Sequence, residues 1–534
     1  MRGIHAAVVI ALGLILGVPF IMRPRSVEVR RDAATIVIVT PHVQQIRSEF
    51  GEAFSRWHER VYKEPIAVDW RTPGGTSDIR KQLEAQYAAL AKSGRFKTKA
   101  ARTVSPAEKE QLTEIELESG AVAFDAMLGG GSYDHRKLKE GVVVSIGDRR
   151  VRVRMSRPAT LTARQLEAIF GENKIGTEQL YDEDQFWLGT ALSSFGIVYN
   201  RRVLRDLGLP EPASFEDLAD PRYAGSVALS DPRQSSSVET SINALLDNYG
   251  WERGWRILRA MCANTRYFTN SSTKPPQDVA AGEAAAGLAI DFYGRGQADA
   301  TMAPGETPAT ARVGYVDPPG TTFVDADPIS LLAGAPHPEL ADRFAEFCLT
   351  DEGQALWQLA ANDTPKGETN PIAEDGRPLG PSHHQLRRMP IRRDLYSRFQ
   401  RSFVDDIDPF ARASKERSRG WRDSIKIMMA SFAIDIADEQ RAAWAAIARA
   451  RARTGFPAER IAEMERVFFD WPEHDIWPEK SPSAGQRLRF TAENYKPIRE
   501  AWRDPAIAAR SRIAYTAFFR DCYRRVVAIE AGKP

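Results

Sequence analysis

The chain has few cysteines and almost no net charge. Its three cysteines, Cys262, Cys348 and Cys522, lie far apart and form no CxxC pair, which excludes a cysteine zinc site and a dense disulfide framework. A single disulfide between Cys262 and Cys348 remains an alternative to three buried thiols. The 73 basic and 71 acidic residues give a formal net charge of +2. Because nucleic-acid binding needs a concentrated basic surface, we expect no nucleic-acid partner.

The sequence also lacks the short motifs of common enzyme classes. It contains no G-x-S-x-G elbow, no G-x-x-x-x-G-K-[ST] phosphate loop, no H-E-x-x-H pair and no G-x-G-x-x-G after a strand. Ser132 and His135 follow a glycine run, but two residues so close in sequence are more typical of a turn and a helix start than of a nucleophile and its base. We therefore expect a protein that is not an enzyme and needs no cofactor. An enzyme site on such a fold remains an alternative, because function resides in the site and not in the architecture.

One long apolar run lies at the amino terminus. Residues 6–22 follow Arg2 and His5 and precede Arg23, which is the order of an export signal or a membrane anchor. The run of 17 residues is at the short limit for a helix that spans a bilayer. It ends without an Ala-x-Ala cleavage pattern and without a lipoprotein cysteine. We predict that residues 1–33 form an uncleaved anchor in the inner membrane and place the rest of the chain in the periplasm, with a cleaved signal as the alternative.

After this segment the chain alternates strand and helix patterns. Residues 34–40 (ATIVIVT) have the β-branched run of a strand covered on both faces, and residues 43–62 repeat apolar groups at helical spacing. A second strand is expected at 66–70 and a second helix at 76–91. This βαβα order predicts a mostly parallel sheet. The polar residues 92–119 are expected to form a surface insertion.

Further strand patterns follow at residues 121–128, 194–200, 227–230, 285–293 and 312–316. One sheet would need very many strands to include them all, so we predict an α/β fold of two lobes joined by hinge strands. The expected division is residues 34–130 with 311–350 in the first lobe, residues 131–310 in the second lobe, and residues 351–401 as helices and loops that complete the lobes.

The carboxy-terminal residues 402–534 predict a helical extension. Residues 421–453 have the pattern of one or two amphipathic helices, and residues 495–529 return to helix after a proline-containing loop. An apolar stripe on the first of these is expected to be core; it consists of Trp421, Ile425, Met428, Met429, Phe432 and Ile436. The extension packs on one lobe or contacts a membrane partner, and its sequence does not decide between these roles.

Four motifs together carry a family resemblance: Thr40–His42, Phe124–Asp134, Asp220–Gly225 and Gly282–Gly287. In this order they resemble the family 1 bacterial extracellular solute-binding proteins, the substrate-binding proteins of ABC transporters, and most closely their ferric-iron-type branch. The resemblance implies a two-lobed periplasmic-binding-protein fold, type II-like, with a ligand in the cleft. It also implies a monomer that delivers the ligand to a membrane permease driven by an ATPase.

The expected site lies beyond the carboxyl ends of the strands, where loops and helix starts converge. Hydroxyls and free backbone N–H groups at helix starts favour an organic anion such as a phosphonate or a phosphate ester. The candidate ligand-binding residues are Thr40, His42, Gly75, Thr76, Ser77, Gly130, Gly131, Ser132, Ser193, Ser194, Ser235, Ser236, Asp291, Tyr293 and Asp327.

Ferric iron is the alternative ligand. Relatives that carry iron place two adjacent tyrosines where this chain has Asp291, Phe292 and Tyr293, and Phe292 cannot ligate a metal. An iron site here would use His42 and Tyr293. We therefore expect no metal, and the predicted function is the substrate-binding component of an ABC-type importer. An exported enzyme or a sensor acting on a small anion remains open.

Overall fold

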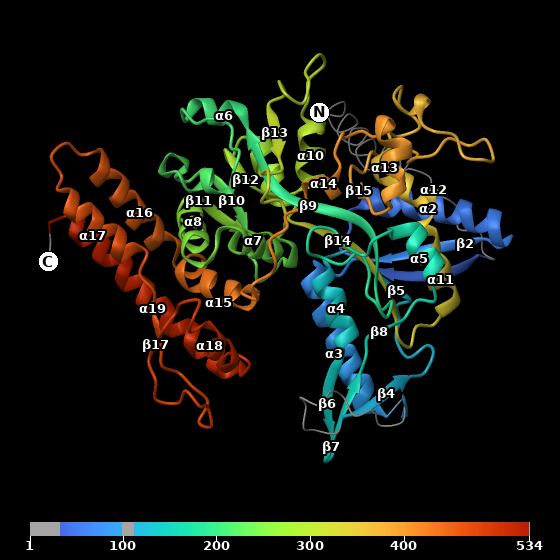
Figure 1. Cartoon of the computed structure of the whole chain (residues 1–534), viewed down its shortest axis with the longest axis horizontal. Coiled ribbons are helices and arrows are strands. Elements are labelled where there is room, and N and C mark those ends of the chain that lie inside the picture. Colours follow the sequence, from blue (N-terminus) through green and yellow to red (C-terminus); the bar gives the residue numbers. More distant parts are fainter. Residues whose placement is uncertain (1–32, 95, 99–111, 533–534) are drawn as a thin grey trace, which may run out of the picture.

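The structure is a computed structural model that describes residues 33–94, 96–98 and 112–532. Its polypeptide forms two α/β lobes and a further group of helices at the carboxy-terminal end (Figure 1). The predicted anchor at residues 1–33 lies outside the described residues except for its last residue. Among the residues that are described, none of the helices is both long and apolar enough to cross a membrane.

The first lobe is built on the sheet order β2-β1-β5-β14-β9. β1 (Ala34–Val39) lies parallel to β2 (Ile66–Arg71) and to β5 (Ala126–Leu128), as the βαβα pattern predicts. β14 (Val324–Leu332) runs antiparallel to β5. The main helices of this lobe are α2 (Gln44–Tyr62), α3 (Thr76–Ser93), α4 (Ser132–Glu140), α11 (Pro338–Leu349) and α12 (Asp351–Gln358).

The second lobe continues the same sheet in the order β9-β12-β10-β11. β10 (Val227–Ser230) is parallel to both β11 (Thr265–Thr269) and β12 (Ala286–Ile290), and β13 (Val313–Val316) pairs with β9. The helices of this lobe are α6 (Arg201–Asp206), α7 (Ser236–Tyr249), α8 (Trp251–Ala263), α9 (Lys274–Ala281) and α10 (Asp291–Ala300).

A single long strand joins the two lobes. All 13 residues of β9 (Leu188–Asn200) are buried. Its first half pairs with β14, where Ser194 is opposite Val324, and its second half pairs with β12, where Phe195 is opposite Ile290. The chain returns from the second lobe to the first lobe between β13 and β14. The two-lobed α/β fold with hinge strands is therefore confirmed.

The first lobe contains more of the chain than the sequence pattern predicts. We expected residues 131–310 in the second lobe, but β7 (Arg149–Val153) pairs with β4 (Thr113–Leu117), and β8 (Ser156–Arg157) pairs with β14. The crossing occurs at β9 and not at the glycine loop, so residues 131–187 lie with the first lobe. The expected polar insertion is also partly structured: β3 (Phe96–Thr98), β4, β7 and β6 (Val142–Ile146) form a small sheet over α3.

Residues after α12 complete the first lobe. The short strand β15 (Met389–Pro390) pairs with β9, and α13 (Arg393–Phe399) and α5 (Ala163–Phe170) pack against each other. A short helix, α14 (Pro409–Arg412), then leads from the first lobe toward the extension.

The extension shares one hydrophobic core with the second lobe. Trp251 and Trp255 of α8 lie in the same buried cluster as Phe432, Trp471 and Phe519, and the whole predicted apolar stripe from Trp421 to Ile436 belongs to that cluster. Each of the two segments expected to be helical, residues 421–453 and 495–529, forms two α-helices. The extension consists of α15 (Arg422–Phe432), α16 (Ala437–Ala452), α17 (Ala458–Phe468), α18 (Tyr495–Ala501), α19 (Pro505–Glu530) and the short pair β16 (Glu473–His474) and β17 (Leu488–Arg489).

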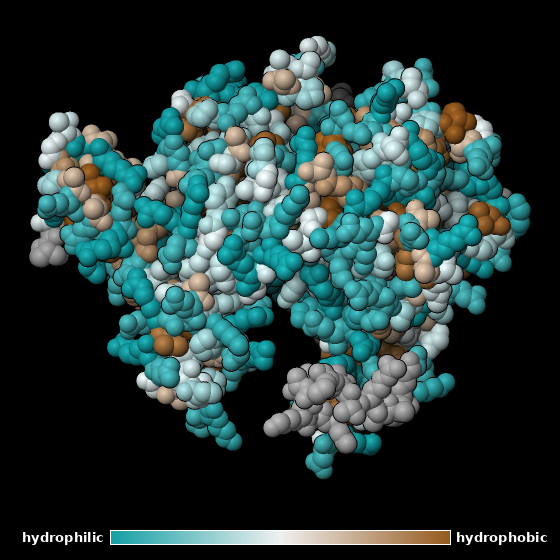
Figure 2. All heavy atoms as spheres, in the orientation of Figure 1, coloured by the Kyte–Doolittle hydropathy of each residue, from teal (hydrophilic) through white to brown (hydrophobic). Residues whose placement is uncertain are grey.

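The three cysteines are buried free thiols. Cys262 lies in the core that the second lobe shares with the extension, whereas Cys348 lies in the core of the first lobe. The alternative disulfide between them is therefore absent from this structure. The space-filling view shows a mostly hydrophilic surface and a notch between the lower part of the extension and the first lobe (Figure 2).

Candidate ligand-binding site

A cavity of about 360 Å³ lies where loops from both lobes meet. The loops follow β1, β2, β5, β10, β11 and β12, so they sit at the carboxyl ends of parallel strands, as expected for an α/β ligand site. The crossing strands supply one more wall. The lining residues are Pro41, His42, Gly74, Gly75, Thr76, Gly130, Gly131, Ser193, Phe195, Gln234–Ser237, Thr240, Asn270–Thr273, Ile290, Phe292, Tyr293, Asp325–Asp327 and Arg388.

Helix starts from both lobes open onto this cavity. α3 begins after Gly75, which provides no side-chain cap, and α7 begins after Ser235, whose hydroxyl accepts a hydrogen bond from the Val238 amide. First-turn amides and the helix dipole make these two starts favourable for an anion. Opposite lobes therefore present the same kind of anion-binding group to one cavity. α9 begins after Thr273, but Pro275 and Pro276 in its first turn have no N–H group and the Lys274 amide donates to the Ser271 carbonyl, so this start offers no free first-turn amide.

Two glycines bring the backbone close to the cavity wall. Gly129 and Gly130 adopt φ values of +94° and +106°, which residues with a side chain rarely adopt. A Cβ atom at Gly129 would lie 2.6 Å from the His42 ring, and a Cβ at Gly130 would lie 2.4 Å from Thr76. The loop after β5 can pass this close only because both positions are glycine.

A buried cluster of His42, Asp327 and Arg388 forms one wall. His42 Nε2 lies 2.9 Å from Asp327 Oδ2 and 2.7 Å from Arg388 Nη1, and Arg388 pairs directly with Asp327. The Arg388 guanidinium also lies 4.3 Å from the centre of the Phe292 ring. Burial lowers the pKa of His42, so the imidazole is neutral at neutral pH. Burial alone would raise the pKa of Asp327, but Arg388 and His42 outweigh it and hold that pKa below its ordinary value.

Asp325, which lies two residues before Asp327 on β14, has a pKa that is shifted in the opposite direction. Burial, with a smaller contribution from Glu178, raises the pKa of Asp325 to about 7. Its Oδ2 accepts a hydrogen bond of 3.1 Å from the Ser132 amide at the start of α4. Its Oδ1 and the Nδ1 of His42 have no hydrogen-bond partner among the residues that the structure describes. Because buried polar atoms are normally paired, two such atoms at the cavity wall indicate places for ligand groups.

Ten of the fifteen residues expected to bind ligand line the cavity: His42, Gly75, Thr76, Gly130, Gly131, Ser193, Ser235, Ser236, Tyr293 and Asp327. The other five lie behind the wall and hold it. Thr40 accepts from the His42 amide, Ser77 bonds to Ser236, and the Ser132 amide bonds to Asp325. Ser194 donates to Asp317, and Asp291 faces Arg295 in a buried ion pair.

The residues named for an iron site, His42 and Tyr293, both line the cavity. Burial raises the pKa of Tyr293 to about 12, so its phenol resists the ionisation that a ferric ligand needs. The Phe292 ring contacts the Tyr293 ring in a tilted arrangement, with centroids 4.1 Å apart. Within the described part of the chain, no three His, Cys, Asp or Glu side chains are grouped so that they could hold a metal ion.

Sequence reasoning missed several lining residues, and two parts of the lining show why. Arg388 follows the region with clear strand patterns, and no local signal connects it to His42, which lies 346 positions earlier. The second part is Asn270–Thr273, between β11 and α9. This part had a usable signal, because a short β-branched and aromatic run is followed by four polar residues and two prolines.

The comparisons with known proteins agree with the motif resemblance. Residues 154–382 match a family model described as bacterial extracellular solute-binding protein. The phosphoglycerate transport regulatory protein PgtC of Salmonella typhimurium is 24% identical over 274 residues, which are 48% of this chain and 66% of that protein. The aligned region is thus slightly less than two thirds of the relative's length. The resemblance to extracellular solute-binding proteins is confirmed over residues 154–382.

Solved structures with a similar arrangement include three bacterial binding proteins. The substrate-binding protein of an ABC transporter from Agrobacterium tumefaciens has 15% identity and a TM-score of 0.49, covering 77% of this chain and 95% of that one. Iron-bound HitA from Pseudomonas aeruginosa has 15% identity and a TM-score of 0.47, covering 74% and 98%. The periplasmic binding protein AfuA from Actinobacillus pleuropneumoniae, with fructose 6-phosphate bound, has 18% identity and a TM-score of 0.46, covering 73% and 98%.

Proposed function

We propose that this chain is the substrate-binding component of an ABC-type importer and that its ligand is a small organic anion, in particular a phosphate ester or a phosphonate. The observation that carries the proposal is the cavity of about 360 Å³ into which the starts of α3 and α7 open from opposite lobes. A small ester fits a cavity of this size. Its anionic group would accept hydrogen bonds from first-turn amides and hydroxyls.

The charged residues of the cavity support an anion more than a metal. Asp327 is already neutralised by Arg388, and Asp325 is partly protonated near pH 7 because of its raised pKa. The wall therefore has little free negative charge to repel an anion. Oδ1 of Asp325 is free to accept a hydrogen bond from a ligand hydroxyl or amine, so the preferred ligand has an anionic end and a hydrogen-bond-donating end.

Binding would act through lobe closure. A ligand held by both lobes stabilises the closed state by the contacts that exist only there. A permease would recognise that closed form, and the family description supports a location outside the cytoplasm. The predicted uncleaved anchor would keep the protein at the inner membrane. As a binding protein, the chain would need no catalytic residue and no cofactor.

The direct test is a thermal-shift screen of the purified full chain. We expect glycerol 3-phosphate, 3-phosphoglycerate, fructose 6-phosphate or a short phosphonate to raise the melting temperature by a few degrees, since ligand at 100 times its Kd contributes about 2.7 kcal/mol. Glycerol, fructose and ferric citrate serve as controls. Stabilisation by ferric citrate alone, or conversion of an ester to product, would overturn the proposal.

A matched pair of variants tests the anion loop. Thr76→Val keeps the size of a side chain at the start of α3 but removes its hydroxyl from the cavity, and we expect binding about tenfold weaker, as for one lost hydrogen bond. Thr516→Val removes a hydroxyl on α19, outside the cavity lining, and should leave affinity unchanged. Equal affinity in both variants would remove Thr76 from the site.

A sensor that passes closure to a signalling partner is the second candidate. The specific observation in its favour is the name of the Salmonella typhimurium relative, a transport regulatory protein. Reconstitution separates the two functions. Ligand-loaded protein should stimulate the ATPase of a co-purifying permease if the chain is an importer subunit. If it is a sensor, the protein should instead change the activity of a signalling partner.

A further inference from the structure

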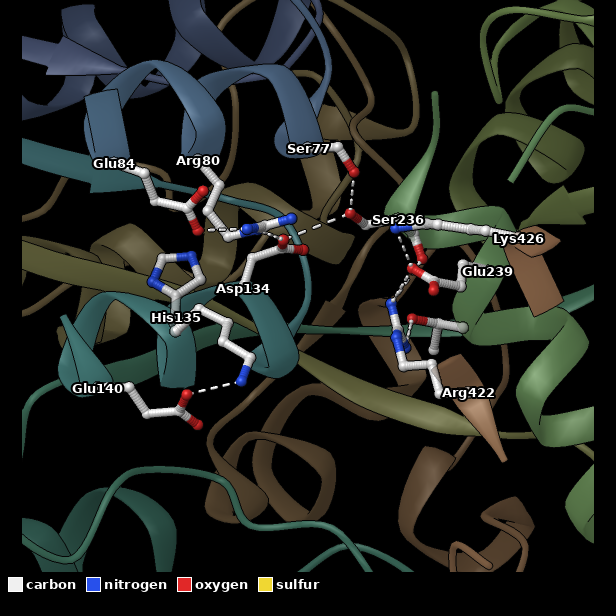
Figure 3. Close-up of polar contacts among 12 residues, drawn as sticks. Ser77, Arg80, Glu84, Asp134, His135, Glu140, Ser236, Glu239, Arg422 and Lys426 are labelled. Carbon is white, nitrogen blue, oxygen red and sulfur yellow. Dashed lines mark hydrogen bonds and ion pairs between the residues drawn. The ribbon is translucent and has the colours of Figure 1, made fainter. Parts of the chain in front are cut away.

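The start of α15 brings the extension to the rim of the cavity. Arg422, its first residue, is about 13% exposed. Its Nη1 donates to Thr240 Oγ1 at 2.7 Å, and its Nη2 donates to the Ser236 carbonyl at 3.2 Å and pairs with Glu239 at 3.1 Å. All three partners belong to the first turns of α7. Since Ser236 and Thr240 line the cavity, Arg422 fixes the second-lobe half of the site from behind (Figure 3).

The same guanidinium also contacts the first lobe. It lies 4.1 Å from the centre of the Tyr133 ring, which belongs to α4. A guanidinium over an aromatic face at this distance is a favourable cation–π contact, and partial burial strengthens it. One side chain of the extension therefore touches both sides of the cleft.

Beside this contact the two lobes meet directly. Ser77 Oγ of α3 and Ser236 Oγ of α7 are 2.5 Å apart, and Ser236 Oγ also lies 3.4 Å from Asp134 Oδ1. Arg80 Nε donates to the same Asp134 oxygen at 2.8 Å. Figure 3 shows these residues as a chain of polar contacts that runs from α3 and α4 to α7. The start of α7 is thus held from one side by the first lobe and from the other side by Arg422.

We propose that Arg422 is a positioning residue of the ligand site, through which the carboxy-terminal extension holds the two lobes closed. The extension cannot separate from the second lobe without breaking their shared core, so a contact between the extension and Tyr133 acts as a second tie between the lobes. Opening the cleft requires that this tie break together with the Ser77–Ser236 hydrogen bond. The inference rests on the proposed function for the role of closure, but closure can be measured without any ligand.

The test measures the distance between the lobes in the full chain. Spin labels at Lys81→Cys on α3 and Glu252→Cys on α8 report that distance; both positions are exposed, and the three native cysteines are buried. We expect Arg422→Ala and Tyr133→Leu to shift the label distance toward longer values in ligand-free protein. The closed-to-open ratio should fall about 5- to 20-fold, the size expected of one partly buried cation–π contact.

Two matched controls isolate the contact across the cleft. Lys426→Ala removes the second cation that pairs with Glu239, at 3.1 Å, but leaves the Tyr133 contact in place. Tyr133→Phe keeps the aromatic face and removes only the phenol oxygen. Both controls should retain the distance distribution of the unmodified chain. If Lys426→Ala lengthened the distance between the labels as much as Arg422→Ala does, the proposal would be overturned.

Folding effects and ligand effects can be kept apart. If Arg422→Ala disturbs the fold, as shown by a loss of helical circular dichroism, the Tyr133→Leu variant decides, because its side chain lies in the other lobe. An unchanged distance distribution in correctly folded Tyr133→Leu would sink the proposal. Failure of every phosphate ester in the thermal-shift screen would sink the proposed ligand class and leave this inference standing.

Discussion

Asp325 and Asp327 lie two residues apart on β14 and line the same cavity, yet their surroundings shift their pKa values in opposite directions. Asp327 has a guanidinium and an imidazole beside it, whereas Asp325 has the Ser132 amide and an unpartnered oxygen. Alternation along the strand explains why the two side chains share one face, but the charges that surround each come from distant segments.

Replacing Asp325 by Asn should stabilise the protein at neutral and higher pH. The folded-state pKa of about 7 is above the ordinary value of 3.8, so the unmodified carboxyl loses folding stability progressively as the pH rises from about 4 through about 7. The gain of Asp325→Asn should therefore be absent below pH 4 and reach at most about 4 kcal/mol above pH 7, at about 1.4 kcal/mol per pKa unit. Chemical denaturation between pH 4 and pH 8 measures it. A gain that is constant over this range would contradict the raised pKa.

Replacing Asp327 by Asn should have the opposite effect. It leaves the buried Arg388 without its carboxylate, and breaking a buried ion pair by removing one partner typically costs about 3–5 kcal/mol. The same denaturation experiment at pH 7 should show a large loss of stability. The double variant Asp327→Asn with Arg388→Met should recover part of that loss, since the unpaired charge is then removed. No recovery would indicate that His42, and not Arg388, depends on Asp327.

At the scale of single elements, the loop between β5 and α4 depends on close backbone approach. Gly130→Ala would place a methyl group 2.4 Å from Thr76 in a backbone conformation with φ of +106°, and we expect a loss of about 2–4 kcal/mol from strain and overpacking together. Gly147→Ala, in the turn between β6 and β7, is the matched control. It has φ of +59° and nothing within 4 Å, so it should lose only about 1 kcal/mol. Similar melting temperatures for the two variants would show that the loop can move away from Thr76.

Local sequence patterns predicted many of the helices and strands. They failed where a strand pattern runs directly into a helix. The apolar runs of β1 and β10 predicted both strands almost to the residue, because each run is short and is followed by a polar residue. Residues 285–293 looked like one strand, but the strand ends at Ile290 and Asp291 begins α10, since an apolar and aromatic run does not mark where a buried helix starts. β6 (VVVSI) and β7 (RRVRV) were missed although their valines are a strand signal; both lie in a small, half-exposed sheet outside the main one.

The site was predictable where it follows strands and unpredictable where tertiary contacts create it. Thr76 and Ser235 could be predicted because each lies where a strand pattern is followed by a helix start, and both patterns are local in the sequence. Ser77 and Ser194 have the right residue type close to the site, but they lie behind the wall, where Ser77 bonds to Ser236 and Ser194 donates to Asp317. Arg388 joins the cavity only because β15 pairs with β9, a contact that no local pattern encodes.

At the scale of the whole molecule, the extension and the second lobe form one unit, and Arg259 of α8 lies at their junction. Its side chain is fully buried. It donates to the backbone carbonyls of Phe468 and Asp470. Its guanidinium lies 4.8 Å from the Phe519 ring and 4.9 Å from the Trp471 ring. The charge is thus held by carbonyl dipoles and aromatic faces that all come from the extension, so neither part retains this arrangement without the other.

We therefore expect Arg259→Ala to loosen the second lobe and the extension together. Loss of the side chain leaves two buried carbonyls unpaired and opens a void, at a cost of about 3–5 kcal/mol. Hydrogen exchange should show faster exchange in α8, α16 and α19 alike and unchanged exchange in α2, whose core belongs to the first lobe. Arg256→Ala, one turn away with an exposed side chain over Phe469, is the control and should change exchange little. Faster exchange in the extension alone would show that it is a separate domain resting on the lobe, in which case the tie through Arg422 could not transmit closure.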